Sequence, residues 1–204
     1  MSKKFQKMDP RVVRTRQMLR DALVELIRER GYEKITVQDI TRRATLNRAT
    51  FYLHYRDKFD LLSQSSNEIL NNLSESIAFS FAEKEEFDFQ SGQPHRSFIH
   101  LFEHISANSK LYKVFLTEKN MSHFTSSMMD ILVDFISRGI NNMQPEDQML
   151  TIPREIAERY FAAAFLEVIT WWLEKDMPYT AQYMATLLMR ITIKGIYVDN
   201  PFLN

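Results

Sequence analysis

A segment between residues 36 and 58 constrains the fold of this chain more than any other part of the sequence. Apolar residues recur there at helical spacing in two short runs, 36–43 and 47–54, with only a tight turn between them. The positions that would pack the two helices together are Val37, Ile40, Ala44, Leu46, Phe51 and Tyr55. Two helices joined in this way form a helix-turn-helix, whose second helix can enter the major groove of duplex DNA.

The flanking residues predict a three-helix unit. Apolar residues upstream recur at helical spacing as far as Ile27, and Gly31 then marks the end of a long first helix. Downstream, Asp57 suits the N-cap of the next helix.

Candidates for DNA contacts follow from side-chain chemistry. Side chains near the N-terminus of a helix in the major groove reach base edges. The residues at that end, with one from the preceding helix, are Asn47, Arg48, Ala49, Thr50 and Gln38. Arg48 matches guanine and Gln38 matches adenine. For Arg42 and Arg43, a contact with the DNA backbone and a solvated helix face are both open.

The stretch from about Arg14 to Leu62 resembles the DNA-binding domain of the tetracycline-repressor-like (TetR/AcrR) family of bacterial transcription regulators. The resemblance is carried by Gly31-Tyr32, Ile35-Thr36-Val37, Asp39-Ile40, Ala44, residues 49–55, Lys58 and Leu61-Leu62. It implies phosphate contacts from Thr36, Tyr52, His54 and Lys58. For Tyr52, simple packing is the alternative. The family commonly has Ala-Gly-Val in the turn, so Thr45 is expected to bring strain or an altered turn.

Charge is divided unevenly along a chain whose formal net charge is zero. Residues 1–60 hold 15 Lys or Arg against 8 Asp or Glu, whereas residues 61–204 hold 11 against 18. This split favours a DNA-binding module joined to a module of another kind. We therefore predict a helix-turn-helix DNA-binding domain over residues 1–56 and a helical effector-binding and dimerisation domain over residues 57–204.

Helical spacing continues beyond residue 57, and strand-type alternation is absent from the sequence. The predicted fold is all-α, with about nine helices. Their ranges are 10–31, 36–43, 47–54, 57–82, 94–106, 109–117, 119–141, 153–175 and 180–197.

Aromatic and methionine residues in the C-terminal part could line an adaptable apolar pocket or fill an ordinary core. The candidates are Phe98, Phe102, Tyr112, Phe115, Phe124 and Met128. The family resemblance implies a small-molecule effector here, and the side chains favour an apolar or amphipathic one.

The last two predicted helices each carry a broad apolar face, which either forms a dimer interface or packs within one subunit. The candidates are Phe161, Ala164, Phe165, Val168, Trp172, Met184, Leu188 and Ile191. The resemblance implies pairing of these helices with their symmetry mates. A homodimer also suits a helix-turn-helix, because two symmetric readers on one palindromic site combine their affinities.

Other classes of protein are disfavoured by what the sequence lacks. Four glycines, none in a phosphate-binding loop, and no Gly-x-Ser-x-Gly motif argue against an enzyme, and no cofactor is expected. The chain has no cysteine, and His100 with His104 supplies too few ligands for a metal site. The longest apolar run, residues 160–173, is too short to span a bilayer. With no signal peptide evident, we expect a cytoplasmic protein without a membrane partner.

The sequence thus favours a dimeric, ligand-responsive transcription regulator. We expect a repressor that binds a palindromic operator and is released by its effector. The alternative is a helix-turn-helix protein whose C-terminal domain docks a protein partner or acts without a small molecule, in a co-activator or architectural role.

Overall fold

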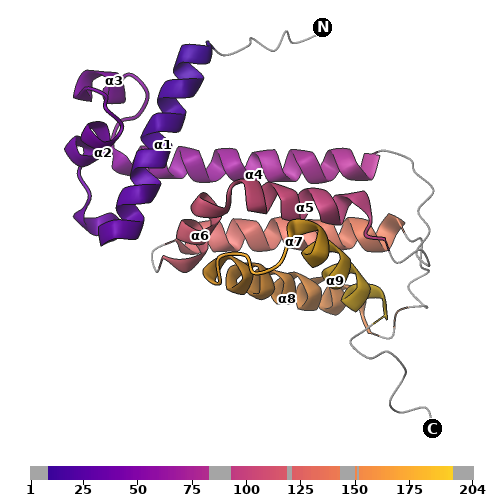
Figure 1. Ribbon diagram of the computed structural model, residues 1–204. Coiled ribbons are helices and arrows are strands. Elements are labelled where there is room, and N and C mark those ends of the chain that lie inside the picture. Colours follow the sequence, from indigo (N-terminus) through magenta and orange to yellow (C-terminus); the bar gives the residue numbers. More distant parts are fainter. Residues whose placement is uncertain (1–8, 83–92, 119–120, 143–149, 151, 195–204) are drawn as a thin grey trace, which may run out of the picture. The chain divides into compact units, whose positions relative to one another are not determined.

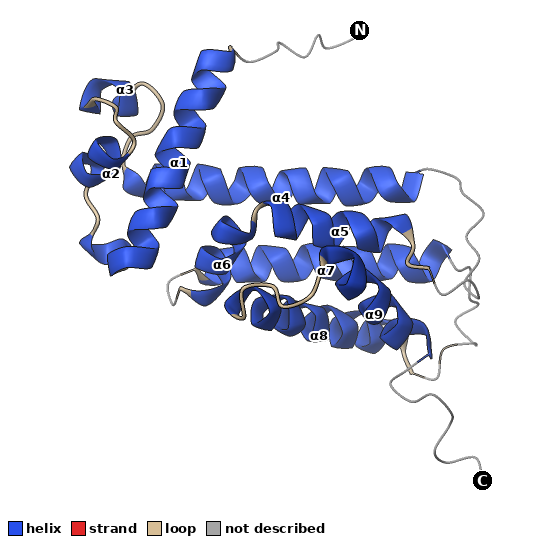
Figure 2. Cartoon of the chain, viewed as in Figure 1, coloured by secondary structure: helices blue, strands red, loops and turns tan. Residues whose placement is uncertain are grey.

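The computed structural model describes residues 9–82, 93–118, 121–142, 150 and 152–194. These residues form nine α-helices and one short 3-10 helix, joined by loops and turns, with no strand among them (Figures 1 and 2). The predicted all-α class is therefore confirmed. No helix in this described part of the chain has the length and apolarity needed to cross a membrane.

The chain divides into two compact units, residues 1–68 and 69–204. The first unit extends past residue 56, where the sequence placed the boundary, because the first turns of α4 (Lys58–Ala82) belong to it. Leu61 and Leu62 of α4 are buried.

The N-terminal unit is built on α1 (Pro10–Arg30), which starts at the N-cap Asp9 and ends at Gly31. Gly31 has φ 76°, a left-handed value that suits glycine. A 3-10 helix, Tyr32–Lys34, follows; the sequence did not predict it. Next come α2 (Val37–Arg43) and α3 (Arg48–Tyr52). The large, fully buried side chains of this unit include Leu19, Leu23, Ile27, Ile35, Ile40 and Phe51.

The C-terminal unit contains the rest of α4 and five more helices. These are α5 (Arg96–Ala107), α6 (Ser109–Thr117), α7 (Ser122–Asn142), α8 (Arg154–Glu174) and α9 (Ala181–Lys194). Helix α5 packs along α9, and α7 packs along α8. Aromatic rings in the core pack edge to face, for example Phe102 on Trp172 with their centroids 5.6 Å apart. The indole nitrogen of Trp172 also donates to the carbonyl of Tyr179 at 2.9 Å, which fastens the turn between α8 and α9.

Most predicted helix limits agree with the structure within two residues. Helix α5 begins after His95, whose ring accepts a hydrogen bond from the backbone N–H of Ser97, so Pro94 precedes the helix rather than opening it. Helix α7 begins at Ser122 instead of residue 119. The predicted end of the last helix, residues 195–197, lies outside the described residues.

Candidate functional site

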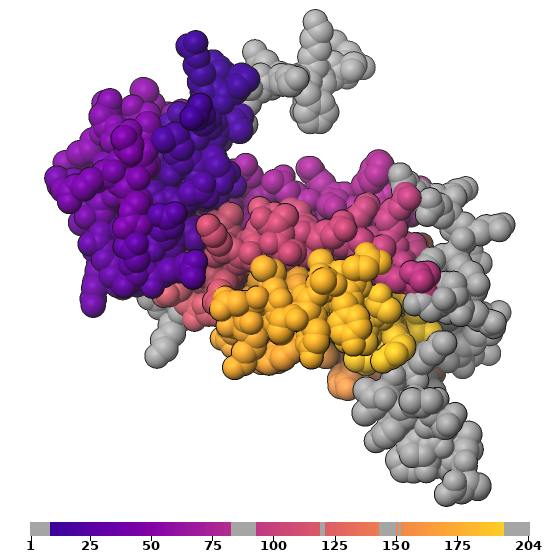
Figure 3. Space-filling model, in the orientation of Figure 1, coloured from indigo at the N-terminus to yellow at the C-terminus, as the bar shows by residue number. Residues whose placement is uncertain are grey.

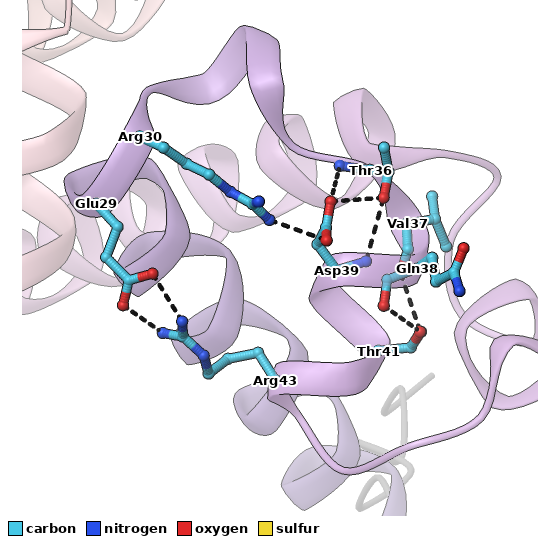
Figure 4. Close-up of polar contacts among 8 residues, drawn as sticks. All are labelled: Glu29, Arg30, Thr36, Val37, Gln38, Asp39, Thr41 and Arg43. Atoms are coloured by element: carbon cyan, nitrogen blue, oxygen red, sulfur yellow. Dashed lines mark hydrogen bonds and ion pairs between the residues drawn. The ribbon is translucent and has the colours of Figure 1, made fainter.

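Helix α2 is fixed at its start by a capping box (Figure 4). The hydroxyl of Thr36 accepts from the backbone N–H of Asp39 at 3.2 Å and donates to the Asp39 carboxylate at 2.6 Å. The backbone N–H of Thr36 donates to the same carboxylate at 3.0 Å. The hydrogen bonds from Thr36, helped by Arg30 at 3.0 Å, lower the pKa of Asp39 to about 2. The hydroxyl for which the family resemblance implied a phosphate contact is thus already engaged in capping.

The arginines of α2 differ in their surroundings. Arg43 reaches across to α1 and pairs with Glu29 at 2.7 Å and Glu25 at 3.0 Å (Figure 4 shows the Glu29 pair). These pairs raise the pKa of Arg43 and lower that of Glu29. Arg43 therefore joins two helices of the unit, a role that the sequence did not reveal. Arg42 is exposed.

The turn between α2 and α3 contains Thr45 at φ 55°. The sequence predicted strain here, and a left-handed β-branched residue bears out that prediction. Asn47 then caps α3, since its side-chain oxygen accepts from the backbone N–H of Thr50 at 2.7 Å and from its hydroxyl at 3.0 Å. Asn47 was expected to contact a base edge, but its side-chain amide oxygen here caps the N-terminus of α3.

Several side chains of the two helices are exposed to solvent. Gln38, Arg48 and Ala49 are exposed, and 51% of the surface of Tyr52 is accessible to solvent. The Arg48 guanidinium lies 5.9 Å from the centre of the Tyr52 ring and donates to its hydroxyl at 3.3 Å. Phe51, in contrast, is fully buried. Arg48 is thereby supported by the aromatic ring of Tyr52, which is itself exposed.

Lys58 occupies a defined position at the start of α4. Its ammonium donates to the carbonyls of Tyr32 at 3.1 Å and Glu33 at 3.3 Å, and lies 4.5 Å from the centre of the Tyr32 ring. The predicted phosphate-contacting residue thus also ties α4 to the 3-10 helix. His54 is half-buried beside Tyr55.

The C-terminal unit holds an apolar cavity of about 140 Å³. Side chains from five helices and the loops beside them line it: Phe81, His95, Ser97, Phe98, Phe135, Ile136, Gly139, Ile140, Asn142, Leu150, Ala157, Phe161, Met189, Thr192 and Ile193. None of these residues is Asp, Glu, Lys or Arg. The cavity is therefore suited to an uncharged, apolar guest.

The sequence located this cavity poorly. Of the predicted pocket residues, Phe98 lines it, whereas Phe102, Tyr112, Phe115, Phe124 and Met128 are buried elsewhere in the core of the unit. Those five therefore do not line this cavity, and helical spacing could not show this, because it identifies which side of a helix is buried but not what that side faces. The sequence did contain one signal of the cavity that was missed, namely Gly139 inside α7. Glycine destabilises a helix interior, so its presence there can indicate that a side chain at that position would occupy needed space.

Tyr112 and His104, whose rings are neighbours, each have one buried polar atom without a hydrogen-bond partner. These atoms are the Tyr112 hydroxyl and the Nε2 atom of His104, whose rings meet edge-on at 6.0 Å. Burial raises the pKa of Tyr112. It lowers the pKa of His104, and a hydrogen bond to the backbone of Ile69 partly offsets this lowering. His100 instead hydrogen-bonds Ser80 at 2.5 Å. Within the described ranges, no three potential metal ligands gather at one point.

The outer faces of α8 and α9 carry exposed apolar side chains. Four of the residues predicted for this face are core residues of the protomer: Phe165, Trp172, Met184 and Leu188. Phe161 lines the cavity, whereas Ala164 and Ile191 are exposed and Val168 is half-buried. The large apolar residues exposed on the two helices are Ile156, Tyr160, Trp171, Tyr183, Ile191 and Ile193. Part of the α9 surface is seen in yellow in Figure 3.

Both units match known family models. Residues 19–64 match the bacterial regulatory proteins of the tetR family, and residues 92–194 match the transcriptional regulator C-terminal region TetR_C_8. The chain therefore belongs to the tetR family of bacterial transcription regulators, as residues 14–62 led us to expect. Its function is that of a transcription regulator rather than an enzyme.

Individual relatives agree with this assignment. The uncharacterised HTH-type regulator YxbF of Bacillus subtilis is 42% identical over 76 residues, which make up 35% of this chain and only 20% of YxbF. The fatty acid degradation regulator FadR of Bacillus halodurans has a similar structure, with a TM-score of 0.67, 19% identity, and coverage of 89% of this chain and 96% of that one. FadR of Bacillus subtilis in complex with stearoyl-CoA gives a TM-score of 0.65 at 20% identity, with coverage of 89% and 99%. These structural likenesses show a shared fold.

Proposed function

We propose that this protein is a dimeric, effector-responsive repressor that binds a palindromic operator and leaves it when a small apolar or amphipathic effector binds. The observation that carries the proposal is the exposed face of α2 and α3, on which Gln38, Arg48 and Ala49 lie open to solvent. Arg48, supported by Tyr52, presents a guanidinium that can make two hydrogen bonds to guanine.

Rigid support distinguishes this face from a merely solvated one. The two helices are capped by Thr36 and Asn47, and α2 is tied to α1 through Arg43. Base readout requires side chains held in a fixed geometry, because each hydrogen bond to a base edge is directional. Phosphate contacts are proposed for Tyr52, His54 and Lys58, and a backbone contact for Thr36 and the start of α2.

Effector binding is proposed for the cavity of the C-terminal unit. Its apolar lining, free of Asp, Glu, Lys and Arg, is consistent with the apolar effector that the sequence suggested. The fatty acid regulator of Bacillus subtilis, which shares the fold, has been solved with stearoyl-CoA, so an acyl compound is a reasonable class of effector to test.

Dimerisation is proposed through the outer faces of α8 and α9. Exposed Tyr160, Trp171 and Tyr183 lie on these helices, and the small exposed residues Ala163 and Ala164 permit a close approach of a second copy. Large aromatic side chains left at the surface are typical of a protein interface. Two copies would present two readers to one palindromic site.

Selection from a random duplex pool by the purified protein, followed by salt-dependent binding to the selected site, tests the proposal. Enrichment of a palindrome is expected, and a pool that stays random would contradict sequence-specific binding by the free protein. Lys58→Ala should weaken binding to all sequences and reduce the slope of log K against log salt by about one. Lys34→Ala, an exposed lysine of the 3-10 helix, is the matched control. If Lys58 only ties α4 to Tyr32, the variant will lose stability while its salt slope stays unchanged.

A further inference from the structure

The cavity of the C-terminal unit is bounded on several sides by aromatic rings. Phe98 and Phe135 meet edge-on with centroids 4.9 Å apart, and Phe81 lies 5.8 Å from Phe135. The ring of His95 in turn stacks on Phe81 at 5.7 Å. Rings already packed against one another resist displacement, so the volume of the cavity is a property of these walls.

Size limits what the cavity can hold. Its volume of about 140 Å³ is close to that of an apolar cavity of about 150 Å³ that stays dry and binds benzene. A guest of roughly six carbon atoms therefore fills it. The stearoyl chain bound by the Bacillus subtilis relative has about three times as many carbons and exceeds this volume.

Polarity limits the guest further. Three of the polar lining residues already bond within the protein: His95 and Ser97 are linked at 2.8 Å, and the Thr192 hydroxyl donates to the carbonyl of Leu188 at 2.8 Å. Among the described residues that line the cavity, none is Asp, Glu, Lys or Arg. Burying an unpaired charge is costly, so a carboxylate or phosphate would have to remain outside.

One of the lining residues, Gly139, has no side chain. A Cβ atom built on Gly139 meets no atom within 4 Å, although Gly139 lies inside α7 and lines the cavity. A larger residue at this position would therefore have open space for its side chain, and most residues would also favour the helix more than glycine does. The absence of a side chain at residue 139 thus leaves room that a helix-favouring residue would reduce.

We propose that this cavity binds a neutral apolar group of about six carbon atoms, either a free small molecule or the end of a short acyl chain, and that Gly139 sets this size limit. The inference rests on the proposed function, since it names the class of effector for the same site. It differs from long-chain acyl recognition, because a volume of about 140 Å³ is too small to hold a chain of that length.

Thermal unfolding of the full chain with three probes tests this. Saturating toluene or hexanoyl-CoA should raise the Tm of the wild type by roughly 2–4 °C, and stearoyl-CoA should leave it unchanged. A shift with toluene alone identifies a free apolar molecule as the source. A shift with hexanoyl-CoA alone identifies a short acyl thioester. If neither probe shifts the Tm, the inference is overturned.

Filling variants locate the binding. Gly139→Leu should abolish both shifts while the variant itself unfolds at or above the wild-type temperature, and Gly139→Ala should retain them because it adds only one carbon. Ala157→Leu, which fills the cavity from α8, is a second blocking variant in case the new side chain at residue 139 turns toward solvent. Shifts that survive both blocking variants, or a stearoyl-CoA shift equal to that of hexanoyl-CoA, would place the ligand elsewhere and overturn the inference.

Operator binding separates this inference from the proposed function. If the probes bind and Gly139→Leu blocks them, but operator affinity never changes, the cavity assignment stands and the effector-controlled release is wrong. If no probe binds while the operator is recognised, the cavity assignment is wrong and DNA binding stands.

Discussion

The two units of the chain hold their helices together in different ways. In the N-terminal unit, α1 is joined to α2 by the pairs of Arg43 with Glu25 and Glu29, and to α4 by the pair of Arg20 with Glu68. In the described part of the C-terminal unit, rings from different helices pack on one another, such as Phe98 on Phe165 and Tyr112 on Phe124. Directional polar contacts fix the geometry of single side chains, whereas ring packing encloses apolar volume.

This difference matches the demands that the proposed function places on each unit. A reader of base edges must keep Arg48 and its neighbours in one arrangement, which capped and paired helices provide. A ligand-binding unit instead needs space that can be filled, and aromatic packing leaves such space around Gly139. The contrast can be tested by changing the residues that produce it.

The largest effect is expected from Phe51→Ala in the N-terminal unit. Phe51 is fully buried between α3 and the rest of the unit, so its removal should cost about 3–5 kcal/mol of unfolding free energy and abolish DNA binding. Phe161→Ala, at the half-buried cavity wall of the other unit, should cost clearly less. Urea denaturation measures both; equal costs would mean that the two units are equally well packed.

Arg48→Ala should act on DNA recognition rather than on folding. Loss of the guanidinium should reduce discrimination at its base pair by about 1–3 kcal/mol, without a matching change in stability. Arg43→Ala is the control, because Arg43 faces α1 and should leave base preference unaltered. Binding to a set of operator variants gives the answer. If Arg43→Ala lost discrimination between base pairs while Arg48→Ala kept it, the two arginines would have the opposite roles.

Tyr112→Phe should stabilise the protein. The Tyr112 hydroxyl is buried without a partner, and an unsatisfied buried group costs more than its apolar replacement, so a gain of about 1 kcal/mol is expected. Tyr183→Phe, at an exposed ring, should change little. Chemical denaturation of the two variants provides the comparison. A loss of stability in Tyr112→Phe would reveal a bound water or ligand that satisfies the hydroxyl.

The smallest effect is a pH dependence caused by His104. Burial lowers the pKa of His104 below its usual 6.5, so below pH 6.5 the unfolded chain binds the proton more readily than the folded one. Its contribution to stability is therefore complete above pH 6.5 and is lost as the pH falls through the lowered value. Melting temperatures at pH 7.5 and 5.5 should differ less in His104→Gln than in the wild type. His123→Gln, exposed on α7, is the control, and an unchanged difference in His104→Gln would refute this account.

Much of the architecture was predictable because helix formation depends on residues a few positions apart. The spacing of apolar residues predicted each long helix, and Gly31 predicted the end of α1. The turn at Thr45 was also expected to be unusual, since a left-handed φ can be anticipated where relatives commonly have glycine. The 3-10 helix at Tyr32 was missed because one short turn leaves no periodic pattern.

The sequence by itself determined the all-α fold, the position of the helix-turn-helix and its exposed Arg48, because all of these depend on local spacing and chemistry. Only the tertiary structure decided that Arg43 pairs with α1, that the Lys58 ammonium lies on the Tyr32 carbonyl, and that Trp172 is core rather than surface. It also selected which aromatic residues surround the cavity. The reason is physical: periodicity identifies the buried side of a helix, but the group that side meets is set by contacts between residues far apart in the chain.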